Sequence, residues 1–222
     1  MPRELNLYLV AGEASGDALG AGLMAALRTL SADATFAGLG GPRMAAEGLE
    51  PLFDIADLDV MGLLEVVPRL RTLRRRIRET VADVLARRPD ALVTIDSPSF
   101  GLRVAQRVRA ADPAIRTIHY VAPSVWAWRP GRARHMAAYV DHVLALLPFE
   151  PPFMEAAGMT CDFVGHPAAA RPPVPEAEIA AARARLGAEG RPRLLLAPGS
   201  RRGEVGRLGP VFAEAAARLA AG

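Results

Sequence analysis

The sequence predicts an α/β fold with a parallel sheet, because short apolar runs alternate with amphipathic helical patterns along the chain. Its 222 residues are enough for one large domain or for two smaller ones. Hydrophobic residues make up 51% and charged residues 23% of the chain, which are ordinary globular proportions and exclude wholesale disorder. Since ligands of such sheets bind beyond the carboxyl ends of the strands, a site is expected there.

Runs of five or six mostly apolar residues predict buried strands, and apolar residues at spacings of three and four predict helices. Strands are expected over Leu5–Val10, Thr35–Leu39, Ala91–Ile95, Thr117–Val121 and Val143–Leu147. Helices are expected over Leu19–Leu30 and Leu102–Ala111, with a further helical stripe at Val67, Leu70, Leu73, Ile77, Val81 and Val84.

A concentration of Gly and Pro between residues 165 and 175 predicts a domain boundary. We expect a first domain over residues 1–166, a linker over 167–175 and the start of a second domain over 176–222. In residues 176–222 the apolar pattern predicts a helix (Glu176–Leu186), a strand (Arg193–Ala197) and a helix (Leu208–Leu219). A lone unit of this size buries too little surface to be stable by itself. Either the chain is a piece of a longer protein, which we favour, or its end docks on the first domain.

Composition limits the compartment and the partners. The net charge is only +3, from 27 basic and 24 acidic residues, which is too small to indicate nucleic acid. No apolar run is long enough to span a membrane, and no secretory leader is apparent, so we expect a cytoplasmic protein. The single cysteine, Cys161, is interpreted as a buried bystander. The four histidines lack partners at metal-ligand spacing, so no metal is expected.

The first predicted strand runs into a Gly-rich segment that contains Glu13, Ser15 and Asp17. Such a segment before a helix usually holds phosphate, but two carboxylates would repel one. They suit the hydroxyls of a sugar, or they stabilise the helix N-terminus with Ser15 as the cap. Both interpretations stay open.

A carboxylate, Asp96, follows the strand that ends at Ile95. At the rim of the sheet it can act as a general base toward a hydroxyl nucleophile, or it can cap the helix that begins near Phe100. His119, at the end of the next strand, is more consistent with a structural histidine. The two tryptophans, Trp126 and Trp128, follow that strand and suit an apolar or sugar-stacking wall.

The turn at Gly199, Ser200 and Arg201 is the better phosphate site, because it combines a predicted helix N-terminus with positive charge. The alternative is a solvated basic turn.

An Arg-rich amphipathic helix between residues 67 and 84 predicts a membrane-surface helix. A core helix with a solvated Arg-rich back is the alternative, and RNA is disfavoured because no aromatic residues are interleaved with the arginines. The proposed membrane and acyl patch comprises Met61, Leu63, Leu64, Val66, Val67, Leu70 and Leu73.

Several of these segments, taken together and in this order, resemble the lipid-A-disaccharide synthase family over nearly the whole chain. They are residues 9–17, 41–44, 60–66, 95–98, 119–128, 147–150, 165–166 and 198–201.

The resemblance implies an inverting glycosyltransferase of the two-Rossmann-domain (GT-B) type, with the second domain incomplete in this chain. It implies transfer of 2,3-diacylglucosamine from UDP-2,3-diacylglucosamine to 2,3-diacylglucosamine 1-phosphate at the cytoplasmic face of a Gram-negative inner membrane, without a cofactor. Asp96 would be the general base. Gly199, Ser200 and Arg201 would receive the UDP diphosphate, and Glu13, Ser15, Asp17, Trp126 and Trp128 would line the acceptor side.

The chain departs from the family pattern at Ser99 and Gly101, where the family commonly has Asp and Asn. We expect weak or absent catalysis from this chain by itself. Two alternatives remain: another UDP-sugar enzyme of the same architecture, which has no need of an acyl patch, or a non-catalytic membrane-binding module, which would be indifferent to Asp96→Ala.

Overall fold

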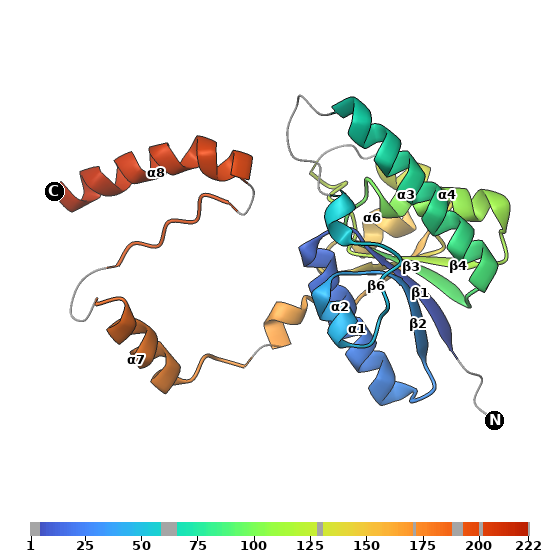
Figure 1. Cartoon of the computed structure of the whole chain (residues 1–222), viewed down its shortest axis with the longest axis horizontal. Coiled ribbons are helices and arrows are strands. Elements are labelled where there is room, and N and C mark those ends of the chain that lie inside the picture. Colours follow the sequence, from blue (N-terminus) through green and yellow to red (C-terminus); the bar gives the residue numbers. More distant parts are fainter. Residues whose placement is uncertain are drawn as a thin grey trace. The chain divides into compact units, whose positions relative to one another are not determined.

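The computed structural model describes residues 5–58, 66–127, 131–170, 172–187, 193–199 and 202–221. The chain divides into two compact units, residues 1–171 and 172–222 (Figure 1). The functional division into an acceptor domain, a linker over 167–175 and a donor domain stays a proposal.

The first unit contains a six-stranded parallel sheet in the order β2-β1-β3-β4-β5-β6, which confirms the predicted parallel α/β fold. The five strands predicted for this unit are all present, β2 and β3 with the predicted bounds. The strands are β1 (Asn6–Ala11), β2 (Thr35–Leu39), β3 (Ala91–Ile95), β4 (Arg116–Tyr120), β5 (His142–Ala145) and β6 (Thr160–Phe163). The last was not predicted, because only Cys161 among its four residues is buried and the apolar pattern is correspondingly weak.

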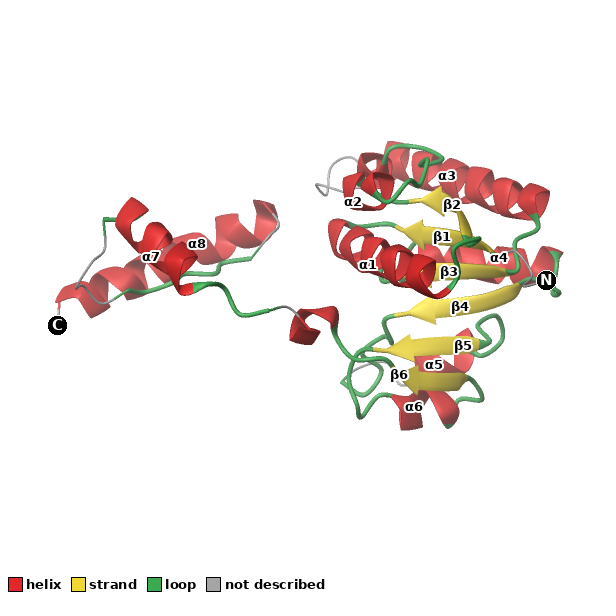
Figure 2. Cartoon of the chain, turned by 90° about the horizontal axis from the view of Figure 1, so that it is seen from below, coloured by secondary structure: helices red, strands yellow, loops and turns green. Residues whose placement is uncertain are grey.

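Helices cover both faces of this sheet (Figure 2). They are α1 (Ala14–Leu30), α2 (Pro42–Ala46), α3 (Val66–Arg87), α4 (Gly101–Ala111), α5 (Gly131–Met136) and α6 (Pro151–Glu155). Alternate side chains of β1 serve the two faces: Leu7 and Leu9 pack with the α1 and α2 side, whereas Tyr8 and Val10 pack with the α3 and α4 side. All residues of β3 are buried, as expected for a strand covered on both faces.

The second unit contains α7 (Glu176–Arg185) and α8 (Arg202–Ala221). The strand predicted over Arg193–Ala197 is wrong, since residues 193–199 have no regular structure. Leu195 in this run is 90% exposed. An apolar run becomes a strand only when a neighbour pairs with its backbone, and no described segment does so here.

Candidate functional site

The strand order places a topological switch point between β1 and β3. From β1 the chain forms β2 on one side and then returns to form β3 on the other side. In open α/β sheets, ligands bind at this point, beyond the carboxyl ends of the strands. Glu13 and Ser15 follow β1 here, and Asp96 follows β3.

Two of the predicted site residues are in direct contact at this switch point. The Ser15 hydroxyl donates a hydrogen bond of 2.7 Å to the Oδ2 atom of Asp96, although 81 residues separate them in the sequence. Neither residue caps a helix: the N-caps of α1 and α4 are Glu13 and Phe100, and neither makes a side-chain cap bond. The capping alternatives for Ser15 and Asp96 are therefore wrong.

The backbone that carries Asp96 is in an unusual conformation. Asp96 and Ser97 have φ angles of 50° and 39°, in the left-handed region that non-Gly residues rarely adopt. Such conformations cost on the order of 1–3 kcal/mol each and are concentrated at functional sites. The Asp96 N–H donates to the Tyr120 carbonyl at 2.9 Å, and the Phe100 and Gly101 N–H groups donate to the Ser97 carbonyl. These bonds hold the half-buried carboxylate at the rim of the sheet.

Gly12 allows the two strand ends to approach each other. A Cβ atom at position 12 would lie 2.8 Å from the Ser97 hydroxyl oxygen, and Ser97 is buried. A larger residue would separate the first turn of α1 from the turn that bears Asp96. Helix α1 begins at Ala14, so most of the predicted Gly-rich loop is helical, and the half-buried Glu13 stands at its N-terminus.

Asp17 was predicted to line the acceptor side, and the structure contradicts this. Its carboxylate is 3% exposed and accepts hydrogen bonds from the backbone N–H groups of Gly41, Arg43 and Met44, at 2.8, 3.0 and 2.9 Å. These groups belong to the N-terminal turn of α2, where donors need partners and negative charge is favourable. Asp17 therefore anchors α2 to α1 and presents no carboxylate surface to a ligand.

The rim beyond β4 carries Trp126. This side chain is 45% exposed and contacts Phe149 edge to face, with ring centroids 5.2 Å apart. Val121 precedes it with a φ of 85°, a second strained position at a strand end. Trp128 lies outside the described residues.

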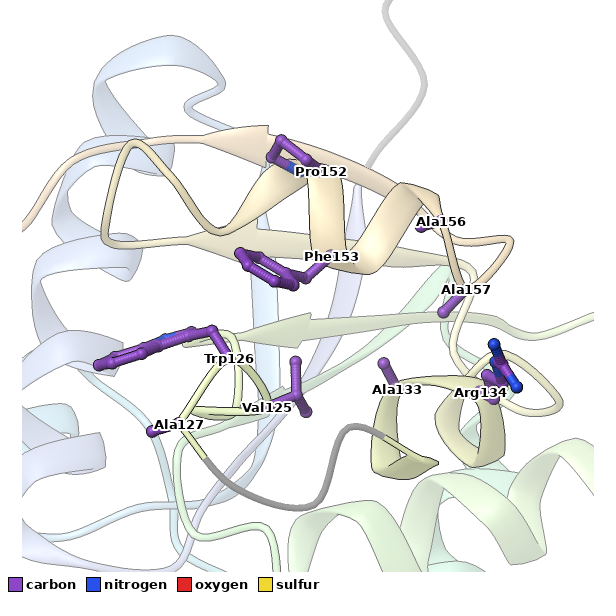
Figure 3. Close-up of a pocket in the computed structure, with 9 residues that line it drawn as sticks. All are labelled: Val125, Trp126, Ala127, Ala133, Arg134, Pro152, Phe153, Ala156 and Ala157. Carbon is purple, nitrogen blue, oxygen red and sulfur yellow. The ribbon is translucent and has the colours of Figure 1, made fainter.

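Trp126 borders a cavity of about 570 Å³ (Figure 3). The Trp126 and Phe153 rings lie at one end, and Arg134 on α5 lies at the other. Apart from Arg134 the lining is apolar, with Val125 and Ala133 below the Phe153 ring. The predicted apolar wall thus has a cavity beside it, formed with α5 and α6, two helices that the sequence analysis did not identify.

His119 is structural. It is 1% exposed, and its Nδ1 atom lies 2.8 Å from the Thr94 hydroxyl on β3. Burial lowers the pKa of His119 to about 4, although the nearby Asp96 carboxylate opposes this shift. The imidazole is therefore neutral at physiological pH and joins β3 to β4. Cys161 is also buried, and burial raises the pKa of its thiol to about 11, which keeps it unreactive.

The proposed membrane patch is only partly described. Met61, Leu63 and Leu64 lie outside the described residues, and so do the side chains of Val66 and Val67. Leu70 is 42% exposed. Leu73 instead packs with Ile77 and Val84 against the core, so its assignment to the patch is corrected. After Leu70, the apolar residues of α3 lie on the face of the helix that packs against the core, because they recur at helical spacing. No helix in the described part of the chain could cross a membrane.

Two residues of the predicted diphosphate turn, Ser200 and Arg201, lie outside the described residues. Gly199 has a φ of 118° and lies against the Glu204 side chain: a Cβ atom added there would be 2.5 Å from the Glu204 Oε2 atom. The strand expected before this turn is absent, as noted above. Among the described residues there is no group of three or more His, Cys, Asp or Glu side chains placed to hold a metal.

These features define the class of protein: a doubly wound α/β domain with a positioned carboxylate at its switch point. A family model described as lipid-A-disaccharide synthetase matches residues 7–221. The chain belongs to this family.

Curated relatives agree with the family match. Proteins described as lipid-A-disaccharide synthase from Ruegeria pomeroyi, Rhodospirillum centenum and Pseudomonas aeruginosa are 59%, 52% and 51% identical to this chain. The alignments cover 98%, 95% and 97% of this chain, and 54%, 53% and 56% of the relatives. The chain thus spans about half the length of the curated relatives it matches. A solved structure, an S. aureus MnaA–UDP co-structure, is 12% identical with a TM-score of 0.45, covering 72% of this chain and 42% of that chain.

Proposed function

We propose that this chain forms the acceptor side of a glycosyltransferase that makes lipid A disaccharide 1-phosphate. The proposed donor is UDP-2,3-diacylglucosamine, the acceptor is 2,3-diacylglucosamine 1-phosphate, and UDP is released. Membership of the family supports the reaction class. The observation that carries the assignment of the site is the contact between Ser15 and the strained Asp96 at the switch point.

In this proposal Asp96 is the general base. The acceptor 6-hydroxyl takes the position of the Ser15 hydroxyl against Oδ2 and donates its proton to that atom as the oxygen attacks the donor anomeric carbon. The anomeric C–O bond to the diphosphate breaks with inversion, and UDP leaves. A positioned base of this kind contributes about 10²- to 10⁴-fold to a rate.

Other residues have supporting roles. Ser15 and Glu13 would orient acceptor hydroxyls, and Trp126, with Trp128, would form an apolar wall beside the sugar. Gly199, Ser200 and Arg201 would bind the diphosphate and stabilise the leaving group without a metal. We also propose that the chain lies on the inner membrane at its cytoplasmic face, with the apolar segment before α3 in the bilayer; the exposed Leu70 supports this.

The acyl chains distinguish this function from that of another UDP-sugar enzyme with the same architecture. In a longer protein that carries this chain together with a complete donor domain, we expect acceptor-dependent UDP release with the diacylated donor and at least about a hundredfold less with UDP-N-acetylglucosamine, because only the former can use an apolar surface. Release of UDP can be followed with a coupled assay. Equal rates with both donors would favour the alternative enzyme, and vesicle binding without any sugar transfer would favour the non-catalytic module.

A further inference from the structure

The cavity beside Trp126 is large enough for a ligand, and its lining is almost wholly apolar. Its volume of about 570 Å³ is in the range of ligand sites. Of the described residues that line it, only Arg134 is charged. We call it the α5–α6 cavity, because these two helices supply most of its walls (Figure 3). A ligand that fills it gains free energy in proportion to the apolar surface removed from water.

One end of the α5–α6 cavity lies at the same rim of the sheet as the switch point. Trp126 follows β4, which pairs with β3, the strand that precedes Asp96. The Asp96 N–H donates to the carbonyl of Tyr120, the last residue of β4. The Trp126 and Phe153 rings form this end of the cavity, whereas Arg134 stands at the other end (Figure 3). The cavity therefore leads away from the rim, toward Arg134.

The end of the cavity at the rim is formed by exposed aromatic side chains. Trp126, Phe149 and Phe153 are all exposed, and the Trp126 and Phe149 rings are in edge-to-face contact. Single exposed apolar residues are normal on a protein surface, but a cluster of large ones beside a cavity indicates a binding site. Hydrocarbon laid against these rings would cover them from water.

Small side chains keep the α5–α6 cavity open beyond the rings. Ala133 on α5 is buried, and Ala156 and Ala157 follow the last residue of α6. Each of them leaves space that a larger side chain would fill. Arg134 is exposed, so its methylene stem can line the cavity while its guanidinium group stays in water. Hydrocarbon that extended past this residue would meet charge and solvent, so the apolar lining has a defined end.

We propose that the α5–α6 cavity binds one of the two acyl chains of the acceptor. This site rests on the proposed function, since a diacylated sugar has to occupy the switch point. The sugar lies beside Asp96, the bound chain passes the Trp126 and Phe153 rings, and its methyl end stops before Arg134. The second acyl chain stays outside the cavity. The site therefore adds chain-length selectivity to acceptor binding, because only the methylene groups between the rings and Arg134 are covered.

The test measures how the affinity of the chain for its acceptor depends on acyl length. The probes are analogues of 2,3-diacylglucosamine 1-phosphate whose two chains lengthen from butanoyl to tetradecanoyl, titrated calorimetrically below their micelle concentrations. We expect the affinity to rise about fourfold for each methylene group that enters the cavity, and then to level off. Decanoate, which has a chain but no sugar, should bind at least about tenfold more weakly than the decanoyl analogue, because it cannot use the switch point.

Ala156→Phe fills part of the α5–α6 cavity from an exposed position, so the fold should be retained. In this variant the rise should end at a shorter chain. The affinity for the longest analogue should fall at least about tenfold, which corresponds to about two excluded methylene groups. The affinity for the butanoyl analogue should not change. Ala25→Phe is the matched control, because Ala25 is exposed on α1 and does not line the cavity.

A second pair of variants removes aromatic surface instead of adding it. Phe153→Ala should weaken binding of the long analogues, whereas Phe163→Ala should not, since both phenylalanines are exposed but only Phe153 lines the cavity. If no analogue bound the wild-type chain, the acceptor site and the proposed function would fail together with this site.

Binding that ignored chain length, or an Ala156→Phe variant that matched Ala25→Phe, would overturn the acyl site alone. An affinity that rose without levelling off would indicate an open apolar surface in place of a cavity. Decanoate binding as tightly as the decanoyl analogue would make the cavity a fatty-acid site. Either of these two results would also overturn the assignment.

Discussion

In a longer protein that carries this chain together with a complete donor domain, replacing Asp96 by Asn is expected to lower kcat for sugar transfer by about 10²- to 10⁴-fold, with little change in the KM for the acceptor. Asn keeps the shape of the side chain and can still bond the acceptor hydroxyl, but it cannot accept its proton at neutral pH. The free energy of unfolding should stay the same or rise slightly, because Asn is tolerated better than most residues at a φ of 50°. Steady-state kinetics and urea denaturation together separate the two effects.

Asp33→Asn is the matched control for this substitution. Asp33 is exposed and lies between α1 and β2, before the start of β2 and so at the opposite edge of the sheet from the site. The Asp33→Asn substitution should leave both kcat and the free energy of unfolding unchanged. Full activity in the Asp96→Asn variant would remove the general base from the proposal and leave Asp96 with a structural role.

Asp17→Asn is expected to cost about 3 kcal/mol of folding free energy, the largest stability effect among the predicted site residues. An Asn side chain has only one acceptor oxygen, whereas the Asp17 carboxylate serves three backbone donors through two. At least one of these three N–H groups would face an amide NH₂ group. Gly41 provides the space that the carboxylate occupies, since a Cβ atom there would lie 2.8 Å from Oδ2. The midpoint of urea denaturation measures this loss.

Acceptor binding distinguishes this structural role from the one expected from the sequence. Measured well below the denaturation midpoint, the acceptor affinity of Asp17→Asn should equal that of the wild type. Unchanged stability together with weakened acceptor binding would contradict the structural role and would support the acceptor-binding role that was expected from the sequence.

The strands were predictable because a parallel sheet buried on both faces needs continuous apolar runs. Ala91–Ile95 is such a run, and the structure gives β3 the same bounds. The run at Arg193–Ala197 is also largely apolar but lacks a pairing partner among the described residues, and composition alone carries no information about partners. The short helix α6 was missed because two prolines open it, although proline is compatible with a first helical turn.

At the site, the sequence identified residue types but could not decide their partners. Ser15 and Asp17 are two positions apart on α1, yet one faces the rim and Asp96, and the other faces the buried start of α2. That difference depends on residues far away in the sequence: Asp96, which contacts Ser15, is 81 positions from it, and Gly41, which contacts Asp17, is 24 positions from it. The segment at Gly41–Met44, one of those on which the resemblance rested, supplies the donors to Asp17. In this chain the segment therefore has a structural role, because it joins α2 to α1.

The central claim is that the switch point of this chain forms an acceptor site, and one titration tests it most directly. Adding 2,3-diacylglucosamine 1-phosphate to the chain should quench tryptophan fluorescence saturably, because the exposed Trp126 follows β4, the strand next to β3, and is proposed to line the acceptor side. A short-chain phosphatidylglycerol at the same concentrations should not produce a saturable change. Equal responses to both lipids would contradict the account and would mean that the rim beyond β4 is a general lipid surface.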